Sequence, residues 1–247
     1  MSTAKLVEFG DGLQVFASSN IEARFLHEEI FQVGCYNDIV LPAEPFVIDA
    51  GANIGMFALY IKQRYPAAQI LAFEPAPETA EVLRRNIELH GLDGISVYEM
   101  ALGSIAEQQA SFTYYPAIPG NSTLHPGQTG PAKEALGKIY TARVAERFYK
   151  GREITVDVQP LSAFLPAGRP VDLLKVDVEG SELDVLHGIE DAQWPLIRQA
   201  MLEVQGGDTR LTAVCDLLTR HGLEPSVGRG PQSDTDVPAR LVHAVRR

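Results

Sequence analysis

The sequence is poor in the residues and runs that mark extracellular or membrane-bound proteins. Its 247 residues include two cysteines, Cys35 and Cys215, which lie far apart and outside any CxxC motif. This pattern argues against a disulfide framework, a structural zinc site and a thioredoxin-like motif. No apolar run approaches the ~20 residues that a membrane helix needs, and residues 1–13 lack the apolar segment of a secretion signal. These absences predict a cytoplasmic protein without membrane contact.

Basic residues are also scarce. The chain has 21 Lys and Arg against 32 Asp and Glu, so its formal net charge is −11. This balance argues against nucleic acid as the main partner, because phosphate binding needs a basic face. Hydrophobic residues make up 45% and charged residues 21% of the chain, values close to the globular average that exclude a disordered or fibrous protein. The length suits one large domain or two small ones.

From residue 46 onward, short apolar strands alternate with amphipathic helices. Strands are expected at 46–48, 69–73, 95–98, 172–176 and 200–204, and helices at 54–64, 77–90, 181–187 and 210–221. This alternation is typical of parallel βαβ units in a doubly wound α/β sheet. Two further strands are expected at 224–228 and 240–245, separated by a polar turn at 230–238.

Two segments stand outside this alternation. Residues 1–45 are expected to form an N-terminal flap, with a hairpin around Gly10-Asp11-Gly12 and a helix over 21–33. Residues 46–247 then form the main domain, which carries an insertion at 115–152 rich in proline and glycine. Connections of this length are usually functional lids or disordered segments. A strand at 153–158 is expected to pair with residues 109–114.

A glycine loop follows the first strand of the main domain and opens its first helix. It reads Asp49-Ala50-Gly51-Ala52-Asn53-Ile54-Gly55. A dinucleotide fingerprint would need glycine at 53 and 56, where the chain has Asn53 and Met56, and the loop has no P-loop lysine. An NAD-dependent enzyme is therefore disfavoured. An acidic loop suits an ammonium-bearing ligand without phosphates better than a pyrophosphate. A plain strand-to-helix turn is the alternative.

The loop resembles the Asp-x-Gly-x-Asn-x-Gly motif of class I S-adenosylmethionine (SAM)-dependent methyltransferases. Glu74, in Phe73-Glu74-Pro75, follows the second strand, where a carboxylate can accept hydrogen bonds from both ribose hydroxyls. Together with the loop, this acidic residue makes a plain structural turn much less plausible.

A second motif, Lys175-Val-Asp-Val-Glu-Gly-Ser-Glu182, ends the strand at 172–176. With the glycine loop, it resembles the signature of FkbM-type methyltransferases over about residues 45–225. The resemblance implies a Rossmann-like, mostly parallel seven-stranded sheet with a reversed final hairpin. It also implies SAM as cofactor and methyl transfer, usually to a hydroxyl, on a secondary metabolite or sugar-like small molecule, as in natural product biosynthesis.

The resemblance also implies roles for individual residues. The cofactor-binding set is Asp49, Gly51, Ala52, Asn53, Gly55, Glu74, Pro75, Ala101 and Asp177. The expected substrate contacts are Asn121, Ser122 and Glu182. The expected catalytic residues are Asp177, Glu179 and Glu203, with His125, in the insertion, as an alternative base.

Several alternatives stay open on the residues alone. Ser181 and Glu182 also suit the first turn of a helix, and Lys175 can serve as a structural partner of the acidic residues. Crowding among Asp177, Glu179, Glu182 and Glu203 can raise the pKa of one carboxyl, as a general base needs. Alternatively, Asp177, Glu179 and Glu203 can bind Mg²⁺. N-methylation, a non-catalytic SAM-binding module and a homo-oligomer are also left open.

Overall fold

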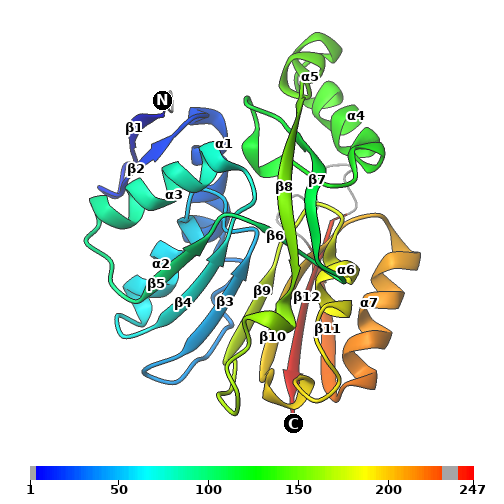
Figure 1. Ribbon diagram of the computed structural model, residues 1–247. Helices are drawn as coiled ribbons and strands as arrows, with labels where there is room; N and C mark the ends of the chain where they lie inside the picture. The colour runs from blue at the N-terminus through cyan, green and yellow to red at the C-terminus, as the bar shows by residue number, and fades with distance from the viewer. Residues whose placement is uncertain (1–3, 230–238) are drawn as a thin grey trace.

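A computed structural model describes residues 4–229 and 239–247, so the turn expected at 230–238 lies outside the described residues. Its main feature is a seven-stranded sheet in the order β11-β12-β10-β9-β3-β4-β5 (Figure 1). The strands are β3 (Phe46–Ala50), β4 (Gln69–Phe73), β5 (Ile95–Tyr98), β9 (Leu173–Val176), β10 (Gln199–Val204), β11 (Leu223–Arg229) and β12 (Arg240–Arg246). Only β12 runs antiparallel to its neighbours, β10 and β11. The expected mostly parallel sheet with a reversed final hairpin is confirmed.

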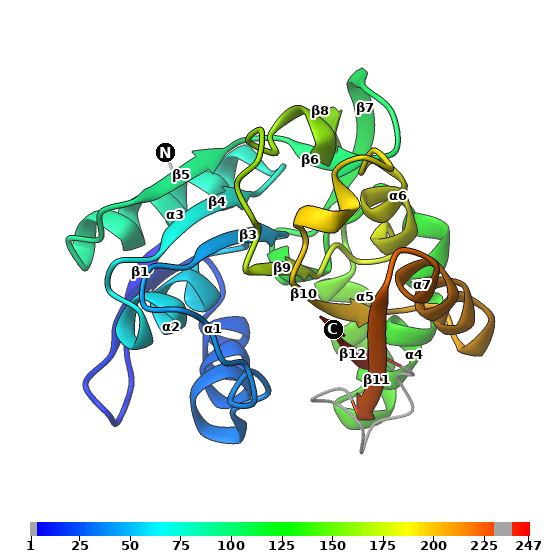
Figure 2. The same cartoon turned by 90° about the horizontal axis from the view of Figure 1, so that it is seen from below.

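Helices cover both faces of this sheet, as the end-on view in Figure 2 shows. On one face lie α2 (Met56–Arg64) and α3 (Pro77–Leu89), and on the other α6 (Glu182–His187) and α7 (Asp208–Arg220). Successive residues of a strand pack on opposite faces of the sheet. Val47 belongs to the core beneath α2 and α3, and Ile48 belongs to the core beneath α6 and α7. This alternation follows from the pleat of a strand, and it buries the sheet on both sides.

The N-terminal residues form the hairpin and the helix that the sequence predicts. β1 (Lys5–Glu8) pairs antiparallel with β2 (Gln14–Ala17), and α1 (Asn20–His27) follows. The end of the predicted helix is different, because residues 28–33 form a π-helix, η1 (Glu28–Val33). Such turns are rare and are frequently found at functional sites.

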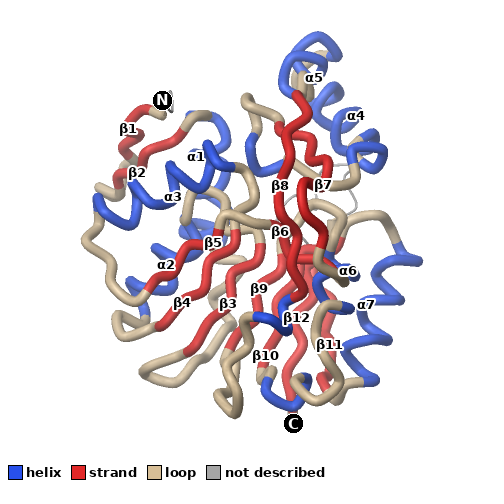
Figure 3. Tube along the Cα trace, in the orientation of Figure 1, coloured by secondary structure: helices blue, strands red, loops and turns tan. Residues whose placement is uncertain are grey.

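A second sheet of three strands lies above the first and carries the insertion (Figure 3). It consists of β6 (Ala101–Gly103), β7 (Glu107–Tyr114) and β8 (Arg152–Pro160). β7 and β8 pair antiparallel, with Phe112 opposite Ile154, as the sequence predicts. The chain between them contains α4 (Gly130–Ile139), α5 (Ala142–Phe148) and short 3₁₀ turns, η2 (Pro119–Asn121) and η3 (Pro126–Gln128). Within the described residues, no helix is long and apolar enough to cross a membrane.

Candidate functional site

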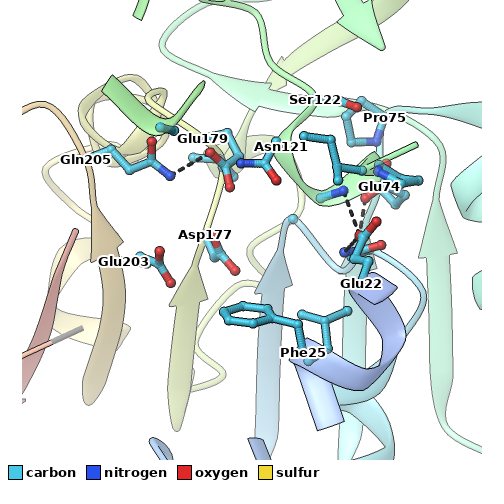
Figure 4. A pocket seen from close by; sticks show the side chains of 18 of the residues that line it. Glu22, Phe25, Glu74, Pro75, Asn121, Ser122, Asp177, Glu179, Glu203 and Gln205 are labelled. Carbon is cyan, nitrogen blue, oxygen red and sulfur yellow. Dashed lines mark hydrogen bonds between the residues drawn. The ribbon is translucent and has the colours of Figure 1, made fainter. Parts of the chain in front are cut away.

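A cavity of about 630 Å³ lies at the carboxyl ends of the parallel strands. Its floor comes from the residues that follow β3, β4 and β9 and from the end of β10. One wall comes from α1 and η1, and another from β6, β7 and the insertion. Open α/β sheets bind their ligands at this edge. The N-terminal helix and the insertion therefore complete a site that the sheet begins (Figure 4).

The glycine loop adopts a backbone that its residue types explain. Gly51 has φ +79°, and a Cβ there would lie 1.8 Å from the backbone oxygen of Asp177. Gly55 has φ +89°, and a Cβ there would lie 2.4 Å from Leu83 Cδ1. Asn53 is also left-handed, with φ 48°, a region that asparagine tolerates. These conformations bring the loop close to the end of β9 and open one side of it to the cavity.

Glu74 lines the cavity beside this loop. Its Oε2 accepts a hydrogen bond from the backbone N–H of Asn53 at 3.0 Å, and its Oε1 accepts one from Ala76 N–H at 2.9 Å. Burial raises the pKa of Glu74 to about 7, although the two backbone hydrogen bonds oppose the rise. Glu74 therefore fixes the glycine loop, and its remaining lone pairs can accept hydrogen bonds from a ligand.

Asp49 lies behind the cavity rather than in its lining. Its side chain is fully buried and pairs with Lys175, whose Nζ is 3.1 Å from Asp49 Oδ1 and 3.5 Å from Asp177 Oδ2. The same ammonium group donates to the backbone oxygen of Gly51 at 2.7 Å. Burial raises the pKa of Asp49, whereas the charges of Asp49 and Asp177 raise the pKa of Lys175 against its burial. Lys175 thus joins the glycine loop to the end of β9.

Asp177, Glu179 and Glu203 all line the cavity, and Figure 4 shows them on the side opposite Glu74. Gln205 Nε2 donates to Glu179 Oε2 at 2.6 Å. Burial and then the charge of Asp177 raise the pKa of Glu179 and of Glu203 well above their usual values. The sequence places the three on strand ends, and in the structure they border one cavity.

Three lining carboxylates, Glu22, Glu28 and Glu29, come from the N-terminal segment, where sequence reasoning missed them. Glu29, in η1, has its pKa raised to about 8 by burial and then by the charge of Asp177. Glu22, in α1, has its pKa raised to about 7 by burial. Acidic residues on an amphipathic helix ordinarily face solvent, so only the packing of α1 against the glycine loop identifies them. Including Glu28, seven acidic side chains and one basic side chain, Arg24, line the cavity among the described residues.

The insertion contributes many of the apolar lining residues. Asn121 and Ser122, which the sequence predicts as substrate contacts, line the cavity, but their side chains also hold the insertion together. Asn121 Nδ2 donates to the hydroxyl of Tyr149 at 3.2 Å, and Ser122 Oγ accepts from Tyr115 N–H at 3.0 Å. Further apolar lining residues come from α4 and α5: Ala132, Ala135, Leu136, Ile139 and Phe148.

Some predicted site residues lie outside the lining. Glu182 is fully buried, where it accepts from Gly180 N–H at 2.7 Å and pairs with Arg210 at 3.4 Å. His125 lies 3.2 Å from Asp184 on the surface side of the insertion. Ala52 and Gly55 also lie outside the lining, whereas Pro75 and Ala101 are part of it. No three His, Cys, Asp or Glu side chains in 4–229 and 239–247 lie close enough together to hold a metal ion.

A seven-stranded sheet of this order, with a glycine loop and an acidic cavity at its strand ends, defines the class of Rossmann-like methyltransferases. The chain belongs to the methyltransferase FkbM domain family, whose model matches residues 49–224.

The chain is similar to several named methyltransferases. It is 44% identical over 214 residues to methyltransferase sdnD of Sordaria araneosa, and 38% identical over 216 residues to 31-O-demethyl-FK506 methyltransferase FkbM of Streptomyces tacrolimicus. Each match covers 82% of both chains. A crystal structure of methyltransferase FkbM from Methylobacillus flagellatus KT has the same fold, with a TM-score of 0.56 at 15% identity over 91% of this chain and 51% of that one.

Proposed function

We propose that this methyltransferase uses SAM and transfers the methyl group to a hydroxyl of a small molecule with an apolar body. The observation that carries the proposal is the cavity lining, which combines seven acidic side chains and one basic side chain with an apolar wall. This charge balance suits a cofactor that carries ammonium and sulfonium groups but no phosphate. The relative named a 31-O-demethyl-FK506 methyltransferase supports oxygen as the acceptor atom.

The residues around the glycine loop fit such a cofactor. Gly51 lets the loop approach the backbone of Asp177 more closely than a residue with a Cβ could, and Asn53 Oδ1 is a buried acceptor without a hydrogen-bond partner among the described residues. We assign cofactor binding to Gly51, Asn53 and Glu74, with Pro75 and Ala101 as neighbouring contacts. Asp49 acts indirectly in this scheme, because it holds Lys175 against the loop.

The acceptor hydroxyl has to lose a proton during transfer. When bound, SAM supplies an electrophilic methyl group on its sulfur. Burial and then the charge of Asp177 raise the pKa of Glu203, and no hydrogen bond from a described residue opposes the rise. A carboxylate with a raised pKa accepts a proton more readily, as a general base must. In our proposal Glu203 takes the hydroxyl proton, with Asp177 and Glu179 beside it, while the apolar wall of the insertion binds the body of the acceptor.

The insertion at 115–152 then acts as a lid over the acceptor, and residues 1–45 act as a flap beside the cofactor. Both assignments rest on the lining residues that these segments supply. In the mechanism that we propose, a general base assists the loss of the hydroxyl proton.

The test combines binding with transfer. The purified protein is expected to bind S-adenosylhomocysteine with micromolar-scale affinity in titration calorimetry and not to bind NAD. Methyl-labelled SAM is then supplied with matched hydroxyl and amine acceptors that have apolar bodies. Glu203→Gln is expected to lose transfer and keep binding, whereas Glu81→Gln, on the exposed side of α3, keeps both.

Other outcomes would contradict the proposal in distinguishable ways. Transfer only to amines would show N-methylation. Binding without transfer to any acceptor would favour a non-catalytic module. Failure to bind S-adenosylhomocysteine would contradict the assigned cofactor itself.

A further inference from the structure

Glu22 joins three segments that are far apart in the sequence. Its Oε1 accepts a hydrogen bond from the side-chain Nδ2 of Asn53 and another from the backbone N–H of Gly120, each at 2.8 Å. Glu22 belongs to α1, Asn53 to the glycine loop and Gly120 to the η2 turn of the insertion. One carboxylate oxygen therefore ties the N-terminal helix to the loop below it and to the insertion above it.

The other oxygen of Glu22 has no such role. Glu22 Oε2 is buried and has no hydrogen-bond partner among the described residues, and the same is true of Asn53 Oδ1. A buried acceptor left without a donor costs about 1–3 kcal/mol, and more when it is charged. Two neighbouring residues in the cavity lining thus each present an unsatisfied acceptor, although each already makes a good hydrogen bond through its other polar atom.

The two acceptor atoms, Glu22 Oε2 and Asn53 Oδ1, belong to side chains in a closely packed neighbourhood. A Cβ on Gly120 would lie 2.9 Å from both Asn53 Nδ2 and Glu22 Oε1. The backbone of Asn53 is held by Glu74 at 3.0 Å, and the charge of Glu22 contributes to the raised pKa of Glu74. Figure 4 shows Glu22 next to Glu74 at the same end of the cavity. The two free acceptor atoms are therefore held in place beside the carboxylate assigned to the cofactor.

We propose that Glu22 is a cofactor-binding residue, an inference that rests on the proposed function. Glu22 Oε2 accepts a hydrogen bond from a donor group of bound SAM, and Asn53 Oδ1 is a second acceptor. The donor is a ribose hydroxyl or the ammonium group of the amino-acid end. Both are neutral or cationic donors that match an acceptor-only pair. The N-terminal helix thereby supplies part of the cofactor site, in addition to covering it.

The experiment measures binding to the full chain by titration calorimetry, with S-adenosylhomocysteine as the probe. Glu22→Gln keeps the shape but can replace the free oxygen with an NH₂ group, and Glu22→Ala removes both oxygens. Each variant is expected to bind roughly 10- to 100-fold more weakly, as for the loss of a hydrogen bond to a charged group. Glu81→Gln is the control, because it removes an exposed carboxylate of α3 that lies outside the cavity lining. It is expected to change affinity less than about twofold, as its charge is screened by solvent.

A second probe, methylthioadenosine, identifies the donor, because it keeps the ribose and lacks the amino-acid end. Weaker binding of both probes to Glu22→Gln assigns the donor to the ribose, and weaker binding of S-adenosylhomocysteine alone assigns it to the ammonium group. Circular dichroism and a cooperative thermal transition establish that each variant is folded.

The proposal is overturned if folded Glu22→Gln binds S-adenosylhomocysteine as tightly as the wild type, or if Glu81→Gln loses as much affinity as Glu22→Gln. Both of these results leave the proposed function standing. Absence of binding to the wild-type protein overturns the proposed function and this proposal together.

Discussion

Replacing Lys175 with methionine tests how Asp49 contributes to the site. Lys175 and Asp49 are 4% and 0% exposed, and their charged atoms lie 3.1 Å apart. At an effective dielectric constant of ~20, a pair at this distance attracts by about 5 kcal/mol, before the cost of desolvation is subtracted. Lys175→Met leaves the Asp49 carboxylate buried without its cation, and losses of this kind are about 3–5 kcal/mol. We expect a destabilisation of this size in urea unfolding at about pH 8.

The stability that Lys175→Met loses depends on pH in a definite direction. Asp49 already has a raised pKa in the folded protein, and without Lys175 it rises further. The folded state then binds a proton that the unfolded state has released, so stability falls as pH rises from the unfolded pKa to the folded one. The deficit of Lys175→Met is therefore expected to be greatest at alkaline pH and to shrink as the solution is acidified and Asp49 is protonated in both states.

A double-mutant cycle supplies the decisive comparison. Asp49→Asn in the Lys175→Met background is expected to recover much of the lost stability, so the two effects are strongly non-additive. Arg84→Met is the control, because Arg84 and Glu99 form an exposed pair at 3.0 Å, and exposed pairs are worth about 0–1 kcal/mol. A loss below about 1 kcal/mol for Lys175→Met, or simple additivity in the cycle, would refute this account of Asp49.

Three further predictions concern single residues. Gly51→Ala places a Cβ 1.8 Å from the backbone oxygen of Asp177 at φ +79°, so calorimetry should find no S-adenosylhomocysteine binding, whereas Gly127→Ala, with nothing within 4 Å, should bind normally. His125→Ala should retain kcat within about twofold of wild type, since His125 lies outside the cavity lining; a tenfold loss would make it part of the reaction. The pKa of Glu74 is raised from 4.5 to about 7, so the unliganded protein should lose up to about 3 kcal/mol of stability relative to Glu74→Gln as pH rises from about 4.5 to 8. Parallel pH profiles of the two proteins in urea unfolding would contradict that assignment.

The sheet was predictable because its signals are local. The strand at 69–73 lies between Pro66 and the Glu74-Pro75 exit, and the structure has β4 at Gln69–Phe73. The same local patterning identifies the helix that begins at Pro77 and ends before Gly91. The π-helix η1 and the short strand β6 have no such signal. η1 continues the apolar spacing of α1, and β6 depends on pairing with β8, whose residues lie more than 50 positions further along the chain.

The site was predictable only in part, for a similar reason. Asp177, Glu179 and Glu203 lie at strand ends, and parallel strands bring their carboxyl ends to one edge. Position in the chain does not tell which way a side chain points, however, so Asp49 and Glu182 are adjacent to the cavity and turned away from it. Glu22 enters the site through contacts across 31 and 98 positions, which no spacing within a single motif reveals.

The meeting of α1, the glycine loop and the insertion at Glu22 has a consequence for the order of folding. The sheet already depends on a long-range pairing, because β3 lies beside β9 and joins residues 126 positions apart. The contact of Glu22 with Gly120 spans 98 positions, so both features require the closure of a long loop, and such contacts slow folding. The sheet and the cavity are therefore expected to be completed together, once β9 and the insertion are both in place. Local opening of α1 would afterwards release the ligand without unfolding the sheet.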